Sequence, residues 1–151
     1  MPRTKRQLAQ HLHAQLAFTL IELMIVLVIV AIVALIAIPN YGPMMQASRE
    51  TSTSNEMLGA LRIARSEAVS RRIGVTMCAS NDQSTCSGTW ANGAVVRATD
   101  GTVIRVIPPV DGVSISGNGI SFRSDGTSAG GTLTVGTKSV TVNSIGHARV
   151  N

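Results

Sequence analysis

One carboxylate stands inside an otherwise uncharged apolar segment near the start of the chain. The segment from Phe18 to Ile38 holds 21 residues, and Glu22 alone among them is charged. A run of this length spans a bilayer as a helix. A carboxylate in that setting is costly unless it finds a partner. Glu22 therefore either lies close enough to the membrane edge to reach water or pairs with a positive group.

Two cysteines offer redox chemistry. Cys78 and Cys86 are the only cysteines among 151 residues, and they lie close together in a polar segment. This pattern is expected of a disulfide in an oxidising compartment, with a pair of free thiols as the alternative. No histidine lies near them, so a zinc site is not expected.

A short basic segment near the C-terminus offers phosphate binding. It reads Gly146-His147-Ala148-Arg149. An arginine stays charged and forks onto phosphate, whereas a histidine side chain near pH 7 is mostly neutral. Arg123 and Lys138 would extend a basic patch if they share its face. Phosphate binding is one interpretation of these residues, and solvated charges on strand edges are the other.

Motifs for catalysis are missing. The sequence has no H-E-x-x-H, P-loop, C-x-x-C or G-x-S-x-G pattern, and beyond residue 17 its only histidine is His147. We therefore expect no enzymatic activity, no catalytic residue, no cofactor, no metal and no small-molecule substrate.

The flanks of the apolar segment predict its orientation. Arg3, Lys5 and Arg6 precede it in a stretch without acidic residues. Positive charge before an apolar segment holds that end in the cytoplasm, which places the rest of the chain outside the inner membrane. An ordinary secretory signal does not fit, because no small-residue cleavage site follows the run before Pro39.

The string Phe18-Thr19-Leu20-Ile21-Glu22-Leu23, the basic leader and the unbroken apolar run resemble the class III signal of type IV pilins and pseudopilins. The resemblance implies that a prepilin peptidase cuts between Ala17 and Phe18 and methylates the new N-terminal Phe18. It also implies that Glu22 attracts the N-terminal amine of a neighbouring subunit and so fixes the register of assembly. The family almost always has glycine where this chain has Ala17.

The helix is predicted to continue beyond the membrane. Apolar residues recur with helical spacing at Met57, Leu61, Ala64 and Ala68. They make one apolar face, which predicts packing on a sheet. Pro39 and Pro43 are expected to bend or locally open the helix, and Gly74 is expected to end it.

Short alternating stretches follow Gly74, separated by turn pairs such as Asn92-Gly93, Asp100-Gly101 and Asn118-Gly119. This pattern predicts an antiparallel β-sheet, or two small sheets, wrapped on the helix. The expected fold class is α+β and type IV pilin-like. Its expected parts are a removed leader (1–17), a transmembrane or filament-core helix (18–39), an amphipathic half-helix (40–73) and a periplasmic β-rich domain (74–151).

The second half of the chain resembles the GspH/FimT family of minor pilins and pseudopilins. The matching features, in chain order, are the Cys78–Cys86 loop, Trp90 with Gly93, Ile120-Ser121-Phe122 before Asp125-Gly126, and Gly146-x-x-Arg149. The resemblance implies a subunit of the bacterial inner membrane with its C-terminal domain in the periplasm. Such a subunit assembles with other major and minor pilins or pseudopilins into a type II secretion pseudopilus or a type IV pilus.

The same resemblance carries an alternative function. FimT-like members include DNA receptors for natural transformation, with a C-terminal Gly-Arg-x-Arg motif. This chain matches one of the two arginines, at Arg149, and has His147 in place of the other. A DNA-binding minor pilin acting in DNA uptake is therefore the second expectation.

Overall fold

The computed structural model describes residues 18–151, without the side chains of residues 38–40. The predicted leader and Ala17 lie outside the described residues. The chain divides into two compact units that meet between Asn40 and Tyr41. Helix α1, Leu20–Arg71, contributes to both, and each unit is described by itself.

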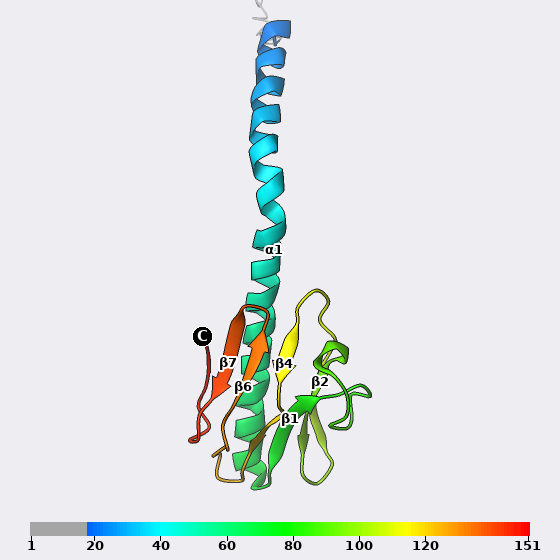
Figure 1. The fold of residues 1–151 in the computed structure, drawn as a ribbon, viewed down its shortest axis with the longest axis vertical. Helices are drawn as coiled ribbons and strands as arrows, with labels where there is room; N and C mark the ends of the chain where they lie inside the picture. Colours follow the sequence, from blue (N-terminus) through cyan, green and yellow to red (C-terminus); the bar gives the residue numbers. More distant parts are fainter. Residues whose placement is uncertain (1–17) are drawn as a thin grey trace, which may run out of the picture. The chain divides into compact units, whose positions relative to one another are not determined.

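In the first unit, α1 is an exposed apolar helix (Figure 1). Its segment Leu20–Ala37 has a mean hydropathy of 3.2, and none of that segment is buried. By length and composition it is able to cross a membrane. Thr19 caps the helix, because its Oγ1 accepts a hydrogen bond from the backbone N–H of Glu22 at 3.2 Å. The helix does not end at Pro39 or Pro43.

In the second unit, the remainder of α1 packs on the strands through the predicted apolar face. Met57, Leu61, Ala64 and Ala68 are all buried. The helix ends at Arg71, and Arg72 adopts the left-handed conformation at φ +56°. The helix thus ends three residues before Gly74, which lies in the turn between α1 and β1. A Cβ on Gly74 would crowd the methyl group of Thr99 at 2.9 Å, so that glycine serves a close approach instead.

Two four-stranded antiparallel sheets complete this unit. The first has the order β3-β2-β1-β5, and the second has the order β4-β6-β7-β8. The first sheet is built from β1 (Val75–Ala79), β2 (Ala94–Ala98), β3 (Val103–Ile107) and β5 (Ile120–Phe122). The second is built from β4 (Ile115–Gly117), β6 (Gly131–Val135), β7 (Lys138–Val142) and β8 (Ala148–Val150). The prediction of two small sheets on a helix is confirmed.

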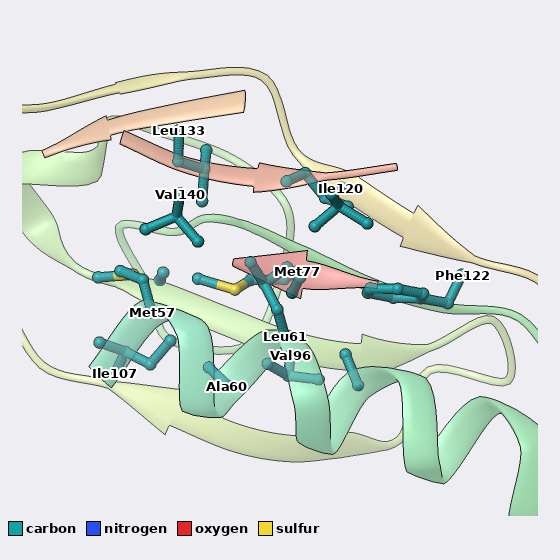
Figure 2. Close-up of a cluster of buried hydrophobic side chains, with 14 of the residues drawn as sticks. Met57, Ala60, Leu61, Met77, Val96, Ile107, Ile120, Phe122, Leu133 and Val140 are labelled. Carbon is teal, nitrogen blue, oxygen red and sulfur yellow. The ribbon is translucent and has the colours of Figure 1, made fainter. Parts of the chain in front are cut away.

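Both sheets share one hydrophobic core with α1. Figure 2 shows Met57 and Leu61 of the helix facing Val140 and Met77 of the strands. Trp90 belongs to this core through the short 3-10 helix Trp90–Asn92. Its indole Nε1–H donates to the carbonyl oxygen of Gly117 at 2.9 Å and so ties this short helix to β4.

Candidate functional site

Glu22 lies in the first turn of α1, on an apolar and exposed stretch of helix. Within residues 18–151 its carboxylate has no hydrogen bond or ion pair, although its backbone N–H is capped by Thr19. Phe18, which the cleavage prediction makes the mature N-terminus, is also exposed. The apolar surface and its carboxylate are therefore both available to a neighbour.

Cys78 and Cys86 form a disulfide, with their Cα atoms 5.4 Å apart. The disulfide prediction is confirmed. Asp82 organises the loop that the bond closes, because its carboxylate accepts hydrogen bonds from the backbone N–H groups of Ser84 and Thr85. The hydroxyl groups of Thr85 and Ser80 add two more. These donors hold the pKa of Asp82 well below its usual range.

The basic segment forms the turn before β8 and the strand itself. Gly146 has φ +78°, and a Cβ there would collide with the carbonyl oxygen of Gly126. The backbone N–H of His147 donates to Oδ1 of Asn143 at 2.8 Å, which closes the turn. Both His147 and Arg149 are exposed and line one small hollow of about 180 Å³. The structure thus brings this predicted pair together.

Lys138 is not part of that hollow. Arg149 stands opposite Thr141 in the β7–β8 register, so both occupy the same face of the second sheet. Lys138 is three residues from Thr141 on β7, and strand alternation places it on the other face. There its charge helps to lower the pKa of Glu50. The structure separates Lys138 from His147 and Arg149.

Arg123 lies at the same end of the unit as His147. It follows β5, and its Nη1 donates to the Thr127 hydroxyl at 3.4 Å. Its turn contacts the turn before His147, because the backbone N–H of Ser128 donates to the carbonyl oxygen of Ser144 at 3.1 Å. No hydrogen bond joins Arg123 to His147 or Arg149 within the described residues.

Two arginines of α1 join this end, and sequence reasoning missed them. Arg62 and Arg65, with His147, line an open groove of about 600 Å³ between the helix and the start of β8. Nε of Arg65 donates to the carbonyl oxygen of Gly126 at 3.1 Å, and its Nη2 donates to that of Ile145 at 2.9 Å. The sequence offered one indication of this pair, namely that Arg62 and Arg65 are three residues apart and lie beside the apolar face of the helix.

Glu50 is a second group that sequence reasoning missed. This buried carboxylate of α1 accepts hydrogen bonds from the backbone N–H of Thr137 at 3.0 Å and from its hydroxyl at 2.7 Å. Gln46 Nε2 adds a third at 3.2 Å. The hydrogen bonds from Thr137 are the main reason why the pKa of Glu50 is lowered. The carboxylate therefore fastens the β6–β7 hairpin to the helix.

Comparisons with known proteins agree with this architecture. The family model described as "Type II transport protein GspH" matches residues 53–147, and the prokaryotic N-terminal methylation motif matches residues 12–38. No curated relative matches the chain.

Two crystal forms of the Pseudomonas aeruginosa type IV minor pilin FimU share the fold, each at 18% sequence identity. One has a TM-score of 0.54 and covers 67% of this chain and 91% of FimU. The other has a TM-score of 0.57 and covers 72% and 92%. The GspH family model spans well over half of the chain, and the methylation motif precedes it. The protein therefore belongs to the GspH family of type II transport proteins.

Proposed function

We propose that this protein is a minor pilin or pseudopilin subunit that assembles into a type II secretion pseudopilus or a type IV pilus. The observation that carries the proposal is the exposed apolar helix with Glu22 in its first turn. An apolar surface of this kind is unfavourable in water, so it is buried first in the inner membrane and then against the helices of other major and minor pilins.

Processing prepares the subunit for that assembly. A prepilin peptidase cuts between Ala17 and Phe18 and methylates Phe18, and the methylation motif over residues 12–38 supports this step. The new amine is positive and lies where a neighbour's Glu22 reaches it. Attraction between the two charges is strong in a low dielectric, and it selects one register between packed helices.

The orientation proposed here places the globular unit in the periplasm. The basic leader favours a cytoplasmic N-terminus, and the Cys78–Cys86 bond fits an oxidising compartment. The subunit would then enter the filament with its β-sheets outward, near the tip, where they contact partner subunits or cargo.

The test is a comparison of Glu22→Gln with Glu22→Asp in cells that carry the filament machinery. Both variants should insert into the inner membrane like the parent. Glu22→Gln should be nearly absent from sheared filaments, because the amine loses its charged partner, whereas Glu22→Asp should retain part of the incorporation. The measurement is immunoblotting of the membrane and filament fractions. Equal incorporation of Glu22→Gln and the parent would show that the pairing role is wrong.

A second candidate function is binding of double-stranded DNA during DNA uptake. The observation that favours it is the hollow shared by His147 and Arg149, which no carboxylate lines. Arg123 lies at the same end of the unit and would extend the contact along a phosphate backbone. Lys138 would not take part, because it lies on the other face near Glu50.

A further inference from the structure

Strand β8 leaves one edge of the second sheet unpaired. It is the last strand in the sheet order and pairs only with β7 among the described residues. Asn151 and Ser139 exchange both backbone hydrogen bonds, and the carbonyl oxygen of His147 accepts from Asn143. In an antiparallel ladder, the backbone N–H and C=O groups of one residue point toward the partner strand and those of the next residue point away from it. The backbone N–H and C=O groups of Ala148 and Val150 therefore face away from β7.

A groove with basic character runs beside this edge. Its helix wall carries Arg62, Ser66, Val69 and Ser70, and its strand wall is Gly146, His147 and Ala148. No carboxylate lines it. The nearest acidic residues along the chain are already engaged, since Glu67 pairs with Arg71 at 2.6 Å and Asp125 accepts from Thr127.

The cations of the groove have different tasks. Arg65 holds two turn carbonyls and so forms part of the fixed wall. Arg62 is exposed and has no hydrogen bond or ion pair within residues 18–151. Val69, at 49% exposed, offers an apolar contact two helical turns further along the same groove. The groove thus combines a free guanidinium, hydroxyl donors and an apolar side chain beside an unpaired strand edge.

These features fit an extended peptide better than a nucleic acid. An extended segment pairs its own backbone with a free strand edge, and its alternate side chains reach the groove. A nucleic acid has no peptide N–H and C=O groups to pair with the strand edge, and no aromatic side chain lines the groove to stack the bases of a single strand.

We propose that the groove between α1 and β8 is a docking site for an extended acidic segment of a neighbouring subunit. The segment adds a strand to the edge of β8 and places a carboxylate against Arg62. This inference rests on the proposed function, in which other pilin-like subunits surround the globular unit.

The test uses the full chain in nonionic detergent micelles and a fluorescent octapeptide that alternates valine and glutamate. Fluorescence anisotropy should show saturable binding. Arg62→Glu should weaken it by about tenfold or more, the usual cost of losing one charge-assisted contact. Arg97→Glu makes the same charge change on β2 of the other sheet, and it should alter the affinity by less than about twofold. The same octapeptide with glutamine for glutamate should bind as weakly as Arg62→Glu binds the parent peptide.

A backbone variant tests the strand pairing separately. Val150→Pro removes an N–H that faces away from β7, so the β7–β8 ladder should survive. Because the Val150 side chain also packs against the core, Val150→Ala is the control, and both variants should lower the melting temperature by a similar amount and leave a folded protein. Peptide affinity should fall by about tenfold in Val150→Pro and by much less in Val150→Ala, which keeps the N–H.

Three results would overturn the inference. One is equal weakening by Arg62→Glu and Arg97→Glu, which would mean general attraction to a basic protein. Another is full affinity in Val150→Pro. The third is Arg62-dependent binding of a labelled DNA duplex with no binding of the peptide. None of these bears on the proposed function, because filament incorporation of the parent is measured independently.

Discussion

Gly146 occupies a position that no other residue fits. Its φ of +78° and its approach to the carbonyl oxygen of Gly126 both require a missing side chain. Gly59 provides a matched control, because it lies in α1 with open space where a Cβ would stand.

We expect Gly146→Ala to lower the free energy of unfolding by about 1–3 kcal/mol, through backbone strain and collision. Gly59→Ala should raise it by up to about 1 kcal/mol, because alanine favours helix. Urea unfolding of the full chain in detergent, followed by circular dichroism, measures both. Equal effects of the two substitutions would show that the turn tolerates a side chain.

The DNA hypothesis makes a prediction about His147 and Arg149. If the hollow binds duplex DNA, Arg149→Ala should abolish most binding, and His147→Arg should strengthen it by about tenfold, since a permanent planar cation replaces the imidazole. Few phosphate contacts release few counterions, so the salt dependence should be shallow. Mobility shifts at low salt measure these effects. Lys138→Ala is the control and should change little. If neither the parent nor His147→Arg binds DNA, the DNA hypothesis is wrong and only the structural role as a filament subunit remains.

Glu50 predicts a pH dependence of stability. Its pKa is lowered in the folded state, so ionised Glu50 stabilises the fold at pH values above its unfolded pKa of about 4.3. That contribution is lost as the pH falls through the lower folded pKa. The melting temperature of the parent should therefore drop more steeply below about pH 4 than that of Glu50→Gln. Thermal melts from pH 6 to 3 measure this, and parallel curves would contradict it. Other carboxylates with lowered pKa values, including Asp82, are present in both proteins, so their effects on the pH dependence cancel in the comparison.

The sequence predicts some of these placements and cannot predict others. His147 and Arg149 are two residues apart beside one strand, so their proximity follows from local geometry. Whether Lys138 shares a face with Arg149 depends on the register of β7 against β8. Whether Arg62 lies near His147 depends on which turn packs beside the helix. Neither is fixed by spacing along one segment, because each depends on how two segments pack against each other.

The disulfide closes a loop in which residues 80–86 form neither helix nor strand. Cys78 anchors one end of the loop in β1. Within the loop, the carboxylate of Asp82 accepts hydrogen bonds from the backbone N–H groups of Ser84 and Thr85. The bond therefore joins an irregular segment to the middle of the first sheet.

Replacing both Cys78 and Cys86 with alanine should lower the free energy of unfolding by about 2–3 kcal/mol, as the chain-entropy estimate gives for a loop of this length. Urea unfolding with and without reductant measures it. Reductant should reproduce the loss in the parent and should have no effect on the double variant. An unchanged midpoint in the double variant would mean that the hydrogen bonds of Asp82 hold the loop alone.

Helix and strands differ in how well the sequence predicts them. The apolar face of α1 follows from spacing alone, and the structure buries all four predicted residues. Spacing does not give the bounds of short strands: Val113-Ser114-Ile115 alternates in the sequence, but β4 covers Ile115–Gly117. A short strand forms where a partner offers ladder hydrogen bonds, and here Gly117 pairs with Leu133 of β6.

Processing concerns the chain as a whole. Coexpression with a prepilin peptidase should remove residues 1–17 and leave an N-methylated Phe18, which mass spectrometry of the mature N-terminus detects. Ala17→Gly should preserve or speed the cut, because glycine is the residue that the family usually has there. Cleavage beyond Ile38, or an intact leader in the presence of active peptidase, would exclude the class III assignment.

The order of strands has a consequence for folding. The chain leaves the first sheet after β3, builds β4 in the second, returns for β5 and leaves again for β6. The first sheet is therefore complete only after two passages of the chain between the sheets, and the second only after three. The two sheets should lose their protection against hydrogen exchange together, as one cooperative unit. If the unit is exported as proposed above, the subunit stays open to periplasmic proteases until its last strands arrive, which favours rapid closure of the whole unit over stepwise assembly.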